Sequence, residues 1–213
     1  GQVIIPVEYD VIGAFDDQGM ALSVKERMHG FLNKQGQEVV PFKYNQLAVF
    51  KNDLSMAKLG SKWGYVNRKG EEVVEIKWDR IADFMDGYAG VLLDGKFGFV
   101  RQDGQVVIEP KYDEIRYFDE GRVGVKRNDR YGYLDLTGKI IIPLIYEEIG
   151  RFYDGICSVR RGGLYGFMDV NGKKITKCEF EPMVYADRDR PFHEVNRDYM
   201  FFDGLAMVKK KGK

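Results

Sequence analysis

Short stretches in which apolar and polar residues alternate recur along the chain, and residues that favour turns separate them. The segment Arg122-Val123-Gly124-Val125-Lys126 alternates with a period of two, which is typical of a strand with one buried face. Val106-Val107-Ile108 and Ile140-Ile141-Ile142 are runs of β-branched residues, whose stiff side chains suit a pleated sheet better than a helix. The pattern therefore predicts strands joined by tight, glycine-bearing turns.

The same pattern returns at a fixed interval of 34 residues. A triplet made of a ring residue, a glycine and an aromatic residue has its glycine at Gly30, Gly64, Gly98, Gly132 and Gly166. A second glycine series keeps the same step, at Gly36, Gly70, Gly104, Gly138 and Gly172. Two interior glycines would cost a helix about 1 kcal/mol each, so the period does not indicate helical repeats. It indicates a tandem array of β units.

One unit is expected to fold as an antiparallel meander. In the example at 121–154 the strands are 123–126, 131–134 and 140–142, followed by a short fourth strand or turn within 146–152. Because glycine weakens a strand, its recurrence inside the second strand suggests that a neighbouring ring or backbone packs directly against it. Counted from the first strand, the complete and partial repeats are 1–18, 19–52, 53–86, 87–120, 121–154, 155–203 and 204–213. The chain is thus predicted to be a single all-β repeat domain over 1–213.

Other positions keep the phase of the repeat and account for residues that would otherwise suggest chemistry. Phenylalanines precede the turns, at Phe15, Phe50, Phe84, Phe118, Phe152 and Phe201. His29 occupies the slot of Trp63 in the next unit, so stacking is expected of it rather than catalysis. Cys157 occupies a small-residue slot, which predicts a buried thiol. A disulfide between Cys157 and Cys178 stays an alternative.

The segment Lys62-Trp63-Gly64-Tyr65-Val66-Asn67, closed by Gly70, resembles the bacterial WG-repeat family, also called KWG repeats. Relaxed copies lie at 97–104, 131–138 and 165–172, and the copy at 29–36 diverges most. The resemblance implies a β-repeat interaction module. A weaker similarity links the hairpin at 161–167 to cell-wall, choline-binding repeats, and it favours an exported or cell-envelope-associated protein.

Such units can stack in an open solenoid or close into a β-propeller. A unit of 34 residues is short for a four-stranded propeller blade, which takes about 40. The chain starts in a third strand, at Val3-Ile4-Ile5-Pro6, and stops after a first strand, so joining the ends would leave one blade without its aromatic-glycine strand. We therefore favour the open array, with propeller-like closure as the alternative. The missing strand also suggests a fragment of a longer repeat protein.

The composition of the chain limits the classes of partner that it is expected to bind. Lys and Arg total 33 and Asp and Glu total 33, and this balance argues against an electrostatic nucleic-acid binder. No apolar stretch approaches the ~18 residues of a transmembrane helix. The sequence has no metal-site, phosphate-loop or nucleophile-elbow motif, so neither a cofactor nor an enzymatic activity is expected. The predicted function is a non-catalytic binding or scaffolding module for a protein or a cell-envelope glycan.

One segment departs from the repeat. The step from Gly172 to Gly204 is 32 residues, whereas the equivalent step from Gly138 to Gly155 is 17, so 15 residues are inserted near 182–199. Added loops on repeat scaffolds often carry binding. The candidate binding residues are those of its charged cluster: Asp187, Arg188, Asp189, Arg190, His193 and Glu194. The alternative function is an enzyme or metal site built on the same insertion.

Overall fold

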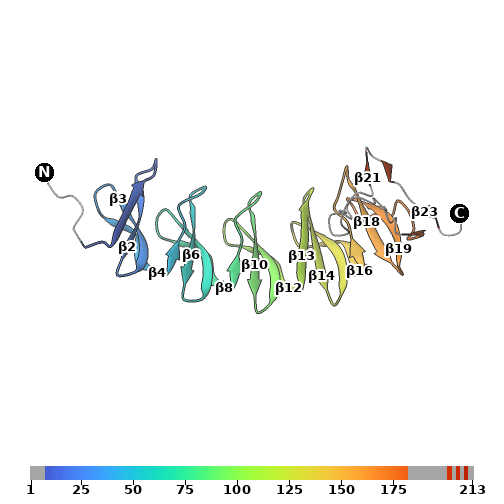
Figure 1. Cartoon of the computed structure of the whole chain (residues 1–213), viewed down its shortest axis with the longest axis horizontal. Coiled ribbons are helices and arrows are strands. Elements are labelled where there is room, and N and C mark those ends of the chain that lie inside the picture. Colours follow the sequence, from blue (N-terminus) through green and yellow to red (C-terminus); the bar gives the residue numbers. More distant parts are fainter. Residues whose placement is uncertain (1–7, 182–200, 203–204, 207–208, 211–213) are drawn as a thin grey trace, which may run out of the picture. The chain divides into compact units, whose positions relative to one another are not determined.

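The chain folds as a series of small antiparallel sheets in a computed structural model that describes residues 8–181, 201–202, 205–206 and 209–210 (Figure 1). All its regular elements over those residues are strands. Among the same residues, no helix could cross a membrane. The chain divides into two compact units, Gly1–Pro110 and Lys111–Lys213, called unit 1 and unit 2 below.

Unit 1 contains three sheets of four strands each, and in every sheet the strands pair in sequence order. The first sheet consists of β1 (Val11–Phe15), β2 (Met20–Lys25), β3 (Met28–Asn33) and β4 (Glu38–Tyr44). The second consists of β5 (Gln46–Leu47), β6 (Leu54–Leu59), β7 (Lys62–Asn67) and β8 (Glu72–Trp78). The third consists of β9 (Arg80–Ile81), β10 (Tyr88–Leu93), β11 (Lys96–Arg101) and β12 (Val106–Tyr112).

Unit 2 continues the pattern with two larger sheets and one small one. The fourth sheet consists of β13 (Glu114–Asp119), β14 (Arg122–Arg127), β15 (Arg130–Asp135) and β16 (Ile140–Tyr146). The fifth consists of β17 (Glu148–Ile149), β18 (Ile156–Arg161), β19 (Leu164–Asp169), β20 (Phe180–Glu181) and β23 (Lys209–Lys210). The remaining pair is β21 (Phe201–Phe202) with β22 (Leu205–Ala206).

The predicted all-β tandem meander is confirmed, and none of the described sheets closes on itself into a barrel. The phase of the sheets differs from the phase in which the repeats were counted. The short strand β17 pairs with β18, which follows it, so it begins the fifth sheet instead of ending the fourth. A two-residue strand carries too little local pattern to reveal its partner. The sheets therefore straddle the sequence repeats.

The glycine of each aromatic-glycine strand lies opposite a bulge in the next strand. In the fourth sheet Tyr131 pairs with Tyr146 and Tyr133 with Ile142, so Gly132 alone faces the three residues 143–145. A Cβ on Gly132 would meet the Ile142 carbonyl oxygen and lie 2.8 Å from the carbonyl carbon of Pro143. The expectation that a neighbour packs on this glycine is confirmed, and the neighbour is backbone of the adjacent strand.

The second glycine series makes contacts between successive sheets. Gly70 has a φ of 81°, and a Cβ there would lie 2.7 Å from the Val39 carbonyl oxygen in the preceding sheet. Gly104 has a φ of 88°, and a Cβ there would collide with the Val73 carbonyl oxygen. These two turns thus need glycine for their backbone conformation and for their close contact with the preceding sheet.

Aromatic side chains fill the space between successive sheets. The ring of Phe84, just before β10, lies 4.8 Å from that of Tyr65 in β7, and Phe152 lies 4.7 Å from Tyr133 in unit 2. The Tyr65 hydroxyl donates a 3.0 Å hydrogen bond to the Ala82 carbonyl. Burial raises the pKa of Tyr65 well above its ordinary value. Core clusters therefore form between neighbouring sheets of a unit, as the repeat pattern implies.

The close approach at Gly98 can be tested within one hairpin. A Cβ on Gly98 would meet the Ile108 carbonyl oxygen and lie 2.9 Å from the Pro110 nitrogen. On Gly90, in the paired strand β10, it would meet only a ring carbon of Phe99 at 3.9 Å. We expect Gly98→Ala to lower the free energy of unfolding by about 2 kcal/mol or more and Gly90→Ala to change it by less than about 0.5 kcal/mol in urea titrations. Equal losses would contradict this account.

Candidate binding surface

The charged cluster predicted to bind, residues 187–190 with His193 and Glu194, lies outside the described residues and stays a prediction. Both cysteines are free thiols, so the disulfide alternative is wrong. Cys157 is buried in its small slot as expected, and burial raises the pKa of its thiol to about 12. His29 is half-buried in β3 opposite Tyr44, as a member of the aromatic slot would be.

The polar residue that follows the last aromatic residue of a sheet holds the next hairpin turn: it is Asn45 in the second sheet and an acid in the later ones. Asp79 accepts a hydrogen bond from the backbone N–H of Asp94 at 2.8 Å, in the turn between β10 and β11. Asp113 accepts from the N–H of Asn128 at 2.8 Å. Asn128 and Asp129 have φ angles of 52° and 58°, the left-handed conformation of a tight hairpin turn. These carboxylates therefore stabilise the hairpin turns of the fold.

The turn at 169–172, which faintly resembles a calcium loop, is held by the side chain of its own aspartate. The Asp169 carboxylate accepts hydrogen bonds from the N–H groups of Asn171 at 2.9 Å and Lys173 at 2.8 Å. The part of the chain that the structure describes has no group of three His, Cys, Asp or Glu side chains placed to hold a metal. Turn geometry accounts for this aspartate.

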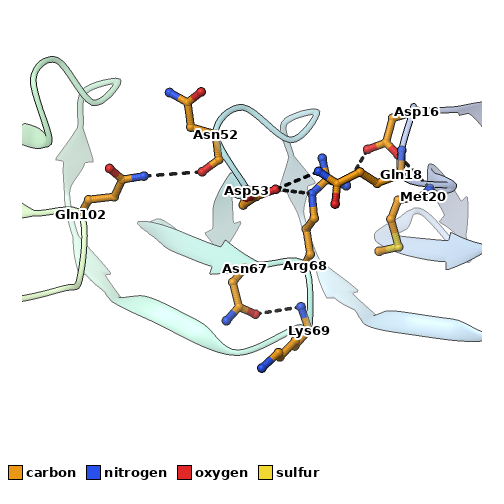
Figure 2. Close-up of polar contacts among 9 residues, drawn as sticks. All are labelled: Asp16, Gln18, Met20, Asn52, Asp53, Asn67, Arg68, Lys69 and Gln102. Carbon is orange, nitrogen blue, oxygen red and sulfur yellow. Dashed lines mark hydrogen bonds and ion pairs between the residues drawn. The ribbon is translucent and has the colours of Figure 1, made fainter.

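One edge of unit 1 brings together polar side chains from different sheets (Figure 2). We call it the turn edge and define it by the loops 16–19, 48–53, 67–70, 82–87 and 101–104. Its centre is Arg68, whose Nη1 donates to Asp16 Oδ2 at 2.7 Å and whose Nε donates to Asp53 Oδ1 at 2.8 Å. The same guanidinium lies 4.4 Å from the centre of the Phe50 ring. Arg68 therefore joins the first sheet to the second.

Two amides extend this network along the edge. Gln18 Nε2 donates to Asp53 Oδ1 at 3.2 Å, and Gln102 Nε2 donates to the Asn52 carbonyl at 3.5 Å. Partial burial opposes the ionisation of Asp16, but hydrogen bonds from the N–H of Met20 and from Arg68 outweigh it and lower its pKa. The Arg68 and Gln18 hydrogen bonds also lower the pKa of Asp53. The loops are therefore held in place before any partner binds.

Two exposed apolar side chains belong to the loops of the turn edge. Val49 is 70% exposed in the loop before β6, and Met85 is 66% exposed in the loop before β10. Lys51, two residues after Val49, has its Nζ 3.6 Å from Oδ2 of Asp83, two residues before Met85. Apolar anchors surrounded by paired charges are typical of protein–protein contact surfaces.

In the aromatic slot, the rings of Trp63 and Tyr165 each have one face covered. Trp63 is half-buried in β7, where it pairs with Trp78, and Lys58 Nζ lies 5.1 Å from its ring centre. In unit 2, the Tyr165 hydroxyl donates to Glu148 at 2.9 Å and the Arg160 guanidinium lies 5.8 Å from its ring. A cation therefore lies over one face of each ring, where a sugar would otherwise stack.

Sequence reasoning missed the turn edge because its residues do not repeat. Arg68 occupies the position that Leu136 and Val170 occupy in later units, and Val49 and Met85 lie in different slots of the loop. They could have been found by examining which positions depart from the 34-residue pattern, and not only which positions agree with it.

Comparisons with known proteins agree on the repeat. A sequence model of the family described as "WG containing repeat" matches residues 1–25, 30–63, 63–97, 97–131 and 131–165. A search of curated proteins finds no match.

Solved structures give distant likenesses. Hsv2p of Kluyveromyces lactis is 11% identical, with a TM-score of 0.35 over 80% of this chain and 66% of its own. KlHsv2 with loop 6CD replaced by a Gly-Ser linker is 10% identical, with a TM-score of 0.36 over 82% of this chain and 71% of its own. PorZ, a surface component of the type-IX secretion system of Porphyromonas gingivalis, is 10% identical, with a TM-score of 0.34 over 78% of this chain and 27% of its own. At TM-scores this low, the likenesses carry no argument about sheet arrangement or function.

The contacts of Arg68 predict a stability effect that depends on pH. Arg68→Met removes both ion pairs and should lower the free energy of unfolding by up to about 1 kcal/mol at pH 7. The lowered pKa of Asp16 stabilises the fold above its unfolded value of about 3.9, and this stabilisation is lost as the pH falls through the folded value. The variant should therefore lose less stability than the parent between pH 5 and pH 2 in chemical denaturation.

The neighbouring exposed Lys69 provides the control for that experiment, because Lys69→Met removes one positive charge from the same loop. We expect it to leave both the stability at pH 7 and its acid dependence close to those of the parent. Matching pH profiles for the two variants would mean that the pairing geometry of Arg68 contributes nothing.

Proposed function

The chain belongs to the family of WG-containing repeat proteins, and from that premise we propose that it is a non-catalytic binding module whose turn edge holds a protein partner. The observation that carries the proposal is the pair of exposed side chains Val49 and Met85, at 70% and 66% exposure, on loops that contact neighbouring sheets. Burial of one such side chain contributes about 1.5–3 kcal/mol, so two can anchor a contact.

The rigidity of the turn edge supports this role. Arg68 is already paired with Asp16 and Asp53, and the ion pair of Lys51 with Asp83 spans the second and third sheets. Loops that are ordered before binding lose less conformational entropy when the partner docks. Because the charges pair with one another, affinity should come mainly from the apolar side chains.

The charge pairing also predicts how binding responds to salt. Raising the ionic strength weakens contacts between unpaired charges of the two partners but leaves apolar burial intact. The complex should therefore persist in about 0.5 M salt. A protein partner is favoured over a glycan because a cation already covers one face of the Trp63 and Tyr165 rings, on which a sugar ring could otherwise stack.

The test starts with the intact chain immobilised and used to capture proteins and, separately, isolated cell-envelope glycans. Each captured protein is purified and its affinity is measured by calorimetry. We expect Val49→Asp combined with Met85→Asp to weaken a true partner by about 100-fold or more, since two buried anchors would become charged. Leu59→Asp is the matched control, because Leu59 is 39% exposed at the far hairpin of β6.

Two results would overturn the proposal. One is a purified partner that binds the double variant and the parent equally. The other is retention by glycans with no protein that binds directly. A chain lacking 182–199 completes the design: unchanged affinity removes the inserted segment from the binding site, whereas lost affinity moves the site to it.

A further inference from the structure

The fifth sheet, in unit 2, contains a cavity that the rest of the repeat does not explain. Its volume is about 160 Å³, and its walls include the apolar parts of Tyr146, Val159 and Met168. All three of these side chains are buried. For scale, an engineered apolar cavity of about 150 Å³ in another protein admits benzene. The space is open to solvent on one side, and its volume is comparable to that of one small ring or a short branched alkyl group.

The cavity arises where the sequence departs from the repeat. The slot occupied by Ile142 in the fourth sheet falls, 34 residues later, on Thr176, which is smaller and polar. In the preceding four sheets this slot holds aliphatic side chains no more than 3% exposed: Val40, Val74, Ile108 and Ile142. In the fifth sheet the Thr176 hydroxyl accepts a hydrogen bond from the Phe167 N–H at 3.1 Å, and β20 begins only at Phe180. The aliphatic side chain that fills this slot in the other sheets is therefore missing at Thr176, and the cavity lies in its place.

The rim of the cavity is cationic. Arg161, Lys174 and Lys177 line it, and all three are exposed. The carboxylate of Glu147, which precedes β17, is already used in the β18–β19 turn, because it accepts hydrogen bonds from the N–H groups of Gly162 and Gly163 at 2.8 and 3.1 Å. An apolar floor beneath three positive charges selects a molecule with an apolar body and one negative group.

We propose that this cavity binds a small organic carboxylate, either an aromatic acid with a single ring or a short branched-chain fatty acid. The ring or alkyl group fills the space left at Thr176, and the carboxylate pairs with the rim. The floor distinguishes this ligand from inorganic phosphate, which has no apolar part to bury. The inference does not depend on the protein-binding role of unit 1.

The test uses the full chain with benzoate and 3-methylbutanoate as probes, followed by ligand-observed and protein-observed NMR. We expect both acids to bind and to shift the resonances of Val159 and Met168. Benzamide, which has the same shape without the charge, should bind at least 10-fold more weakly. Failure of both acids to bind at millimolar concentration would overturn the proposal.

Thr176→Ile restores the residue type of the repeat and is therefore expected to fold and to keep or raise the melting temperature. It should abolish binding by filling the cavity. Lys174→Gln combined with Lys177→Gln should weaken benzoate at least 10-fold and leave benzamide unchanged, whereas Lys173→Gln, which removes an exposed charge outside the lining, should change neither. Undiminished benzoate binding by Thr176→Ile would contradict the site.

Cys178 supplies an independent readout, because its half-buried thiol lines the cavity while Cys157 is buried. Saturating benzoate should slow alkylation of Cys178 by iodoacetamide severalfold in the folded chain, with benzamide at the same concentration having little effect. An unchanged alkylation rate under saturating benzoate would place the ligand elsewhere.

Discussion

The structure depends on one steric constraint: within each unit, a turn glycine lies directly on a backbone carbonyl of the preceding sheet. Gly70 lies on Val39, Gly104 on Val73 and, in unit 2, Gly172 on Ile141. These glycines all have positive φ, so a side chain would be strained by its own backbone and would also push the sheets apart. A single four-stranded sheet cannot bury both of its faces, so stability in repeat proteins comes largely from contacts of this kind between neighbours.

This constraint shapes what is left for function. Most polar groups that recur every 34 residues hold turns or join sheets, as the Asp79 carboxylate and the Tyr65 hydroxyl do. Binding chemistry must therefore come from positions that break the pattern. Two such positions are Arg68, in the turn edge whose loops also expose Val49 and Met85, and Thr176, where a missing aliphatic group opens a cavity. The repeat serves as a scaffold, and its irregular residues carry the specific surfaces.

The same distinction separates what sequence could predict from what it could not. The strands, the fixed step of 34, the close packing of a neighbour on the inner glycine and the buried thiol of Cys157 follow from local periodicity and were predicted correctly. The phase of the sheets was not predicted, because the pairing of β17 with β18 rests on two residues. Two features depend on three-dimensional packing that no local pattern encodes. They are the ion pair of Arg68 with Asp16, 52 positions away, and the cavity beside Thr176. The inserted cluster at 187–194 remains a sequence-based prediction.

The most direct test of the account compares Gly104→Ala with Gly87→Ala by native-state hydrogen exchange. The two glycines belong to the same sheet and have φ angles of 88° and 81°, but only Gly104 has a neighbouring sheet against its α-carbon, whereas nothing lies within 4 Å of a Cβ on Gly87. If seated glycines couple the sheets, Gly104→Ala will lower amide protection in both β7–β8 and β10–β11, and Gly87→Ala will affect only its own turn. Loss of protection confined to the mutated turn in both variants would contradict the account.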